Sequence, residues 1–448
     1  MLVKEKTFYK NFILLCLPLV LQNMISLGVN LADNIMLGKY AEASLSGVTA
    51  VNQIQFVYQN LLIGIGDGMV ILASQYWGQK KLSEIKKISA VALRAGLVMM
   101  VFLFIVVSLF PRQMVGLFTT DPEIIAEGVE YIRLIRFTYP FFCITTLLLA
   151  TLRVVEVVRI ALMLSISTLC INCGINWLLI YGHFGLPRLG VTGAAIGTLT
   201  ARIVELFLLL VFLKRKEKML KLKIRDYLHL DRLLLKDYLK VSLPIIFLQS
   251  LWGVNTALQT AILGHLSSSA IAANSMASNL YLMVKTMAVG AASTTNVIIG
   301  RAIGEGDEIK VRRYANTMQV LFVCLGIAAG LCLFGLTEPV LSLYSFSPES
   351  RRLARSFLHI LCFVMAFMCY QMPVNVGIIR GGGDTSYIMK LDLISIWGIV
   401  IPLSLVVSFL LKAPPEIVVI CLNLDQFFKC IPAFIKVNFG SWMKKLTR

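Results

Sequence analysis

The chain has 448 residues, of which 58% are hydrophobic and only 15% are charged, and its mean hydropathy is +0.80. Soluble globular proteins are about 45–50% apolar and about 25% charged, so the composition excludes an ordinary soluble protein and indicates an integral membrane protein. The net charge of +18 would favour a nucleic-acid partner in a soluble protein, but here the basic residues lie in short connections between apolar segments. The positive-inside rule explains that placement, and we expect no nucleic-acid binding.

Apolar stretches long enough to cross a bilayer, which takes about 20 residues in a helix, follow one another along the whole chain. They lack the period-two alternation of barrel strands, so we predict an all-α membrane protein. Twelve spans are predicted, near residues 12–37, 47–74, 88–110, 124–150, 160–181, 190–213, 241–264, 273–300, 315–336, 355–379, 388–411 and 415–435.

Basic residues concentrate in every second connection, namely 79–87, 153–159, 214–240, 301–313 and 380–390. This asymmetry predicts a multi-pass protein of the cell membrane, in contact with membrane lipids, with both termini cytoplasmic. The longest basic connection, 214–240, holds ten Lys or Arg residues and four acids. We predict that it is a cytoplasmic amphipathic linker, helical and lying on the inner leaflet, between an N-terminal six-helix lobe at 1–213 and a C-terminal lobe at 241–448.

The two halves are repeats, because a shift of 226 residues superimposes their landmarks without a gap. The shift pairs Pro18 with Pro244, Gly64 with Gly290, and Gly78 with Gly304. Six spans per half make the repeats parallel, and two pseudo-symmetric bundles of this kind are the architecture of many secondary transporters.

The first span carries a stripe of polar residues on one helical face, Gln22, Ser26, Asn30 and Asp33, at steps of four, four and three. A carboxylate inside the bilayer is costly unless it faces water, a partner or the protein interior. Asp33 therefore indicates an ion or proton site beside water, the alternative being a hydrogen bond to a neighbouring helix. The shift pairs Asp33 with Gln259, so the second half keeps a polar stripe but has no charge in it.

A second carboxylate, Asp67, shares a face of the next span with Gln53 and Asn60 at steps of seven. It either lies near Asp33 along the substrate path or is satisfied by neighbouring polar helices, and the sequence leaves both open. The predicted substrate cleft consists of the polar residues on these faces: Gln22, Asp33, Gln53, Asn60, Asp67, Gln249, Thr256 and Gln259.

Other charges within spans favour structural roles. Arg202 with Glu205, and Asp425 with Lys429, have the helical spacing of ion pairs. Lys285, in the eighth span, either reaches the membrane surface or presents a positive charge to a cleft. No histidine clusters with Cys or a carboxylate at ligand spacing, and no P-loop or nucleophile motif is present, so we expect neither an enzyme nor a bound cofactor.

Several segments resemble the MATE (multidrug and toxic compound extrusion) family, and the match covers nearly the whole chain. They are P-x14-D-x4-G from residue 18, SQYWGQKK from 74, NWLLIYGHFGLPRLGVTGAAIGT from 176, RGGGDT from 380 and GSWMKKL from 440. The resemblance implies twelve helices in two lobes that face each other in a V, and export of organic cations in exchange for H+ or Na+.

Carried over by position, the resemblance places Asp33 on the family's first-helix aspartate, implicated in cation coupling, and Asn172 and Asn176 on the polar pair of the fifth span. With Asn30, these residues form the expected H+ or Na+ coupling site. Some members carry acids in the seventh and tenth spans, but 241–264 and 357–379 contain none. A sodium site of that kind in the second half is therefore not expected.

The sequence thus predicts a secondary active antiporter, expected to be a monomer, whose partners are small-molecule organic cations. The alternative is a flippase for lipid-linked oligosaccharides or another metabolite exporter of the same superfamily. Such flippases usually have about fourteen helices and a more cationic cavity; Lys285 is the feature that favours them. A channel would not need duplicated bundles, and a membrane enzyme would need a reactive cluster that the sequence lacks.

Overall fold

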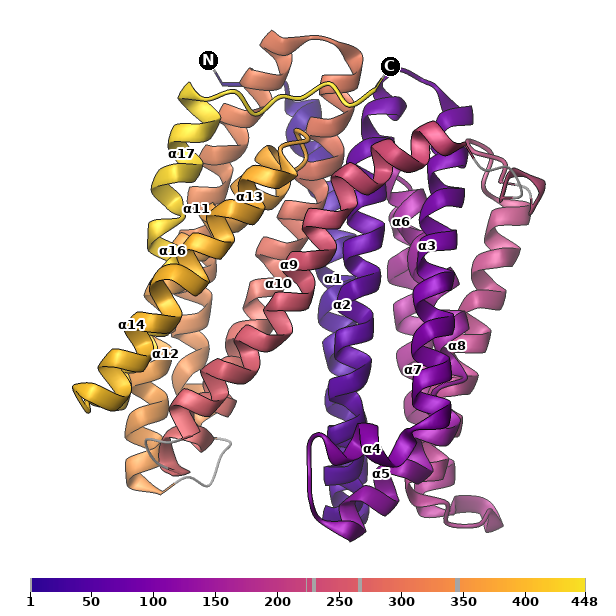
Figure 1. The fold of residues 1–448 in the computed structure, drawn as a ribbon, viewed down its shortest axis with the longest axis vertical. Helices are drawn as coiled ribbons and strands as arrows, with labels where there is room; N and C mark the ends of the chain where they lie inside the picture. Colours follow the sequence, from indigo (N-terminus) through magenta and orange to yellow (C-terminus); the bar gives the residue numbers. More distant parts are fainter. Residues whose placement is uncertain (1, 223, 228–230, 265–267, 343–346, 448) are drawn as a thin grey trace. The chain divides into compact units, whose positions relative to one another are not determined.

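The computed structural model describes residues 2–222, 224–227, 231–264, 268–342 and 347–447, and every regular element in these ranges is helical (Figure 1). The first half contains α1 (Lys6–Tyr40), α2 (Glu42–Gly78), α3 (Leu82–Leu109), α4 (Pro111–Gly116), α5 (Pro122–Ile135), α6 (Thr138–Val154), α7 (Arg159–Tyr181), η1 (His183–Gly185), α8 (Gly190–Arg215) and η2 (Ile224–Tyr227). The second half contains α9 (Arg232–Gly264), α10 (Ser268–Glu305), α11 (Glu308–Ser342), α12 (Pro348–Met372), η3 (Pro373–Ile379), α13 (Thr385–Asp392), η4 (Leu393–Val400), α14 (Ile401–Leu405), η5 (Val406–Leu410), α15 (Pro415–Leu422), α16 (Asp425–Phe428) and α17 (Cys430–Phe439).

The helices confirm the all-α membrane class. Among the described residues, ten helical stretches are long and apolar enough to span a membrane, and α5 with α6 forms an eleventh if the bent pair is one span. The predicted seventh span is α9, a helix of 33 residues. Each of the twelve predicted spans therefore overlaps one helix or a run of consecutive helical segments.

The fourth predicted span is bent where a single helix was expected. Its two parts, α5 and α6, meet at 55° around Arg136 and Phe137. Pro140 lies in the first turn of α6, where it has no N–H to donate to the carbonyl of Arg136. The loss of that hydrogen bond explains the break.

By their contacts, the residues fall into two compact units that do not follow chain order. The C-terminal unit is Met1–Val20, Ser74–Lys80 and Leu243–Arg448, and the N-terminal unit is Leu21–Ala73 and Lys81–Ser242. The first part of α1 thus packs with the second half of the chain: the backbone N–H of Val3 donates to Thr317 Oγ1 at 2.9 Å. Conversely, the first part of α9 packs with the first half, where the hydroxyl of Tyr238 donates to the carbonyl of Ile65 at 2.9 Å. The start of the first helix of each repeat therefore packs with the other repeat.

Within the C-terminal unit, the ends of α2 and α10 meet at the repeat-related glycines Gly78 and Gly304. A Cβ added at Gly78 would collide with the carbonyl oxygen of Arg301, and one added at Gly304 would collide with that of Gln75. The two obstructing residues are themselves related by the 226-residue shift. The duplication is therefore visible as a symmetric backbone contact that only glycine permits on both sides.

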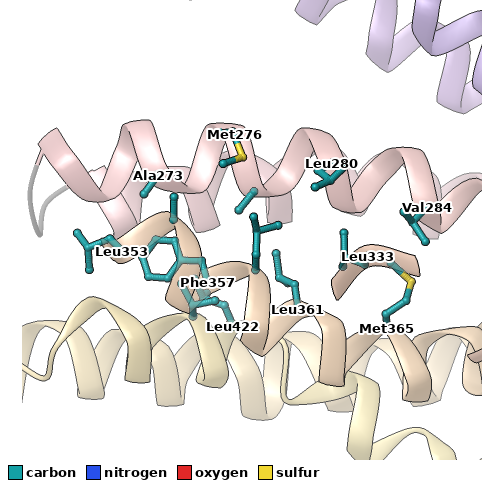
Figure 2. Close-up of a cluster of buried hydrophobic side chains, with 14 of the residues drawn as sticks. Ala273, Met276, Leu280, Val284, Leu333, Leu353, Phe357, Leu361, Met365 and Leu422 are labelled. Carbon is teal, nitrogen blue, oxygen red and sulfur yellow. The ribbon is translucent and has the colours of Figure 1, made fainter. Parts of the chain in front are cut away.

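The core of the C-terminal unit lies between α10 and α12 (Figure 2). Ala273, Met276, Leu280 and Val284 point from one face of α10 toward Phe357 and its neighbours on α12. Their spacing of three and four residues is the apolar stripe of a helix that packs on one side.

The prediction of a helix over the linker 214–240 is wrong for residues 217–222, which are not helical, whereas 232–240 belong to α9 and residues 223 and 228–230 lie outside the described residues. The helix α8 ends at Arg215 and α9 begins at Arg232, and the described residues between them contain only the short η2. The short η2 instead makes contacts with α3. The Arg94 guanidinium donates a hydrogen bond to the carbonyl of Tyr227 at 2.9 Å, and Lys86 pairs with Asp226 at 3.1 Å. The segment is tied to α3 instead of forming a helix of its own.

Candidate functional site

The predicted site residues of α1 and α7 come together inside the N-terminal unit. The side-chain amide of Asn176 donates to Asp33 Oδ1 at 2.7 Å and lies 3.2 Å from Asn172 Oδ1. Asn172 in turn donates to the hydroxyl of Thr198, on α8, at 3.0 Å. Asn172 and Asn176 are fully buried. The three helices thus share a chain of polar groups that ends on a carboxylate.

A close approach of α8 to α7 positions Asn176. A Cβ at Gly197 would overlap Asn176 Oδ1, and one at Gly193 would meet the backbone of Leu179 and Ile180. The small residues of this part of α8 therefore allow the buried amide to lie against the helix backbone. With its oxygen toward Gly197, Asn176 presents its NH2 group to Asp33.

The charge of Asp33 is held by an amide rather than by a salt bridge. Among the described residues, no Lys, Arg or His nitrogen lies within 4.0 Å of its carboxylate. Arg202 acts on Asp33 electrostatically, but its guanidinium donates to Glu205 at 2.7 Å and covers the ring of Phe142. This confirms the predicted Arg202–Glu205 pair. Asp33 is left as a carboxylate without a direct counterion.

The residue that contacts Asp33 also offers an oxygen to a small cation. Within the described part of the chain, Asn176 Oδ1 is a buried oxygen without a hydrogen-bond partner. Neutral amide and hydroxyl oxygens together with a carboxylate are the donors that hard cations prefer. An H+ needs only the carboxylate, so the residues present suit either ion.

The other predicted site residues lie apart from this cluster. Asn30 is exposed on α1, Gln22 is half-buried, and Gln53 is exposed on α2. Asn60 is buried and donates to the carbonyl of Phe56 at 2.8 Å. Gln249, Thr256 and Gln259 lie along α9 in the C-terminal unit, where Thr256 donates to the carbonyl of Trp252 at 3.0 Å.

For Asp67, the structure favours one of the two open interpretations. Its carboxylate is 3.3 Å from the guanidinium of Arg153, which belongs to α6, and both side chains are largely buried. Because a basic partner compensates its charge, Asp67 differs from Asp33. It is a carboxylate satisfied by a neighbouring helix.

The C-terminal unit contains a denser group of charges. Lys429 lies 2.7 Å from Asp392 and 3.0 Å from Asp425, which confirms the predicted Asp425–Lys429 pair and adds a second acid to it. Gln426 also donates to Asp425, at 2.8 Å. The flanking segments η3, η4 and η5 are π-helical, a conformation frequent at functional sites.

A cavity of about 750 Å³ opens in the N-terminal unit beyond the end of the Asp33 stripe. Three of its lining residues are basic, Lys39, His183 and Arg188, and three are aromatic, Tyr40, Trp177 and Tyr181. Basic groups repel cations, so this cavity is not suited to hold an organic cation.

Sequence reasoning missed Gly197, Thr198 and Tyr131. Thr198 and Gly197 belong to the small-residue run at the start of α8, which signalled close helix packing but gave no indication of the partner. The Tyr131 side chain, from α5, interacts with Thr198 and feels the charge of Asp33. No periodicity connects it with either residue, because they lie on other helices.

Duplicated bundles of membrane-spanning helices, with a carboxylate held by amides inside one of them, define a transporter built from parallel repeats. The family model named MatE matches this chain twice, at residues 18–178 and 244–406, and the second match begins 226 residues after the first. The chain therefore belongs to the MatE family of transporters, and the duplication is confirmed.

Individual relatives agree with that assignment. The probable multidrug resistance protein YoeA of Bacillus subtilis is 23% identical over 415 residues, covering 91% of this chain and 89% of its own. The probable multidrug resistance protein NorM of Thermotoga maritima is 24% identical, with coverage of 89% and 85%. A solved outward-facing multidrug resistance MATE family transporter superimposes with a TM-score of 0.87 at 18% identity, covering 96% of this chain and 94% of that one. A MOP superfamily transporter from Pyrococcus furiosus gives 0.85 at 17% identity, with coverage of 96% and 95%.

Proposed function

We propose that this protein is a monomeric antiporter that exports organic cations in exchange for H+ or Na+, from the cell membrane, with both termini cytoplasmic. The observation that carries the proposal is the carboxylate of Asp33, which accepts a hydrogen bond from Asn176 but has no direct counterion among the described residues. The names of YoeA and NorM, as multidrug resistance proteins, support the choice of substrate class.

The chemistry follows from competition for one negative charge. When ionised, Asp33 attracts an organic cation; when it binds H+ or Na+, that attraction is lost. A 180° turn of the Asn176 amide exchanges the NH2 group facing the carboxylate for Oδ1, which is a suitable ligand for Na+. Either ion thereby favours the conformation that releases the substrate, by no more than its difference in affinity for the two conformations.

Ethidium efflux from proteoliposomes tests the proposal. The purified protein is reconstituted, and either a pH gradient or a Na+ gradient is imposed separately. We expect efflux under at least one gradient and its loss in Asp33→Asn, because the amide cannot ionise. Efflux in the variant equal to that of the wild type would contradict the role of Asp33.

A matched control is Glu127→Gln. This carboxylate belongs to the same unit and also accepts one hydrogen bond from a neutral donor, the hydroxyl of Ser44, at 2.7 Å. It should retain gradient-driven efflux, which would separate the loss of a coupling group from the loss of any carboxylate in the unit.

If a folded, correctly oriented protein transports ethidium under neither gradient, polyspecific cation export is wrong. The second candidate, a flippase or metabolite exporter of the same superfamily, then comes first. It is favoured by Lys285 and is tested by translocation of a fluorescent lipid-linked sugar.

A further inference from the structure

A lysine lies in the middle of α10, beside the face that packs in the apolar core. Lys285 directly follows Val284, whose side chain points into the core between α10 and α12 (Figure 2). Successive residues of an α-helix differ by about 100°, so Lys285 lies to one side of that core face. The side chain is neither fully buried nor fully exposed.

The position of Lys285 along α10 favours a charge presented inside the span. Ala273–Glu305 is the part of α10 that is long and apolar enough to cross a membrane, and Lys285 lies twelve residues, roughly 18 Å of helix, from its nearer end. A lysine side chain extends only about a third of that distance.

Residues with polar groups precede Lys285 at helical spacing. Asn274, Ser278 and Tyr281 lie at steps of four, three and four before it, and none of them is fully exposed or fully buried. The ring of Tyr281 also packs against the apolar core. On α9, Trp252 lies within the polar face formed by Gln249, Thr256 and Gln259. Polar faces inside a span mark a wet path rather than contact with lipid.

Trp252 connects the two faces. The ammonium of Lys285 lies 5.4 Å from the centroid of its ring, within the range of a cation–π contact. A cation–π contact engages one side of the ammonium and fixes its position, but an aromatic ring neutralises no charge. The remaining N–H donors stay available to an acceptor.

The carboxylates of this unit are already engaged. Lys429 forms ion pairs with both Asp392 and Asp425, and Gln426 donates a hydrogen bond to Asp425. Asp425 and Lys429 act on Lys285 electrostatically, yet among the described residues no carboxylate lies within 4.0 Å of its ammonium. Lys285 is therefore a positioned cation that no carboxylate contacts directly among the described residues.

We propose that Lys285 and the ring of Trp252 form a subsite for the carboxylate of an amphoteric aromatic substrate, one that carries an acidic group beside its cationic centre. A charge-assisted hydrogen bond from the ammonium supplies the missing anion. The inference rests on the proposed export of organic cations and narrows the substrate class to molecules with both charges.

The test uses a rhodamine free acid and its ethyl ester, which share one cationic ring system and differ only in the carboxylate. Transport of each dye is measured with wild type, Lys285→Gln and Lys285→Arg in proteoliposomes. For the free acid, we expect Lys285→Gln to raise KM about tenfold, the loss of one charged hydrogen bond. The ester should change by less than about twofold, and Lys285→Arg should keep the wild-type ratio of the two dyes.

Three outcomes would overturn the subsite. One is an unchanged KM of the free acid in Lys285→Gln, and another is a wild type that transports the ester but not the free acid. The third is an equal loss of both dyes in Lys285→Gln that Asp425→Asn restores in the double variant. That result would show that Lys285 only balances the charge of Asp425.

Equilibrium binding keeps this test separate from the proposed function. Fluorescence polarisation of both dyes on the purified protein needs neither a gradient nor transport. Preferential binding of the free acid, lost in Lys285→Gln and kept in Lys285→Arg, supports the subsite even if gradient-driven efflux fails. Equal binding of the two dyes to wild type contradicts it even if efflux of ethidium succeeds.

Discussion

The two units carry buried carboxylates in opposite surroundings. In the N-terminal unit, Asp33 accepts a hydrogen bond from the amide of Asn176, whereas in the C-terminal unit Asp392 and Asp425 share the ammonium of Lys429. The two repeats therefore differ in the groups that contact their carboxylates, although they arose from the same duplicated fold. A carboxylate held by neutral groups can bind a cation or a proton at little cost to the fold. Carboxylates that share a lysine already have a counterion.

The largest expected effect is on the shared lysine. Lys429→Met leaves the buried carboxylate of Asp425 and the half-buried carboxylate of Asp392 without their counterion, and we expect it to lower the free energy of unfolding by about 3–5 kcal/mol. Thermal unfolding of the purified protein in detergent measures this. The triple variant with Asp392→Asn and Asp425→Asn removes all three charges and should recover most of the loss. A Lys429→Met protein as stable as wild type would refute the distinction between the two units.

The next effect concerns binding in the N-terminal unit. In Gly197→Ala, the new Cβ overlaps Asn176 Oδ1 and must displace the amide that holds Asp33. We expect a cost of about 1–3 kcal/mol, which appears as weaker coupling-ion affinity, because the amide moves more easily than the helix backbone. The dependence of ethidium efflux on ion concentration measures it. In an Asn176→Ala background the substitution should have little further effect on that affinity.

Asp384, a carboxylate outside the membrane spans, should make the stability of the protein depend on pH. Burial alone would raise the pKa of Asp384, but hydrogen bonds from Lys444 at 2.7 Å and Lys436 at 3.0 Å outweigh burial and hold the pKa below its ordinary value of 3.8. The stability that Asp384 contributes is therefore present above about pH 4 and is lost as the pH falls through the lowered pKa.

Hydrogen exchange of residues 440–447 reports this effect, because Lys444 belongs to that segment. Exchange should stay constant between about pH 7 and about pH 5, after correction for the intrinsic rate, and should increase below about pH 4. In Asp384→Asn the segment should exchange faster at neutral pH and show no acid transition of its own. A transition already present near neutral pH would assign the effect to another group.

The smallest expected effect is the stability change in Asp33→Asn. The new amide keeps an oxygen for Asn176 and loses only a charge that has no direct counterion, so we expect a change of about 1 kcal/mol or less. Thermal unfolding, compared directly with Lys429→Met, measures it. A loss as large as that of Lys429→Met would mean that the charge of Asp33 is structural.

Periodicity and a fixed repeat shift were enough to predict the helices, the duplication and the two i,i+3 or i,i+4 ion pairs, because these features depend on residues close in sequence or on comparison of the chain with itself. The joining of Asp33 to Asn172 and Asn176 came from the family resemblance. Those residues are far apart along the chain, and no local pattern relates them.

Tertiary contacts account for what was missed or wrong. Asp392 and Lys429 are separated by η4, α14, η5, α15 and α16, so no helical spacing suggested that pair. The linker has the composition of an amphipathic helix, but Lys86 and Arg94 offer its polar groups partners that a helix on the membrane surface would lack. The break before α6 depends on a single missing hydrogen bond at Pro140, which hydropathy does not register.

The contact between Gly78 and Gly304 bears on the history of the chain. In an ancestor with one repeat per polypeptide, the same glycine would have met its own copy across a true two-fold axis of a homodimer. A single substitution there would have introduced two collisions at once. After gene fusion the two positions could vary separately, yet each is still opposed by the backbone of the other copy. The pair is best understood as an inherited subunit interface that became internal.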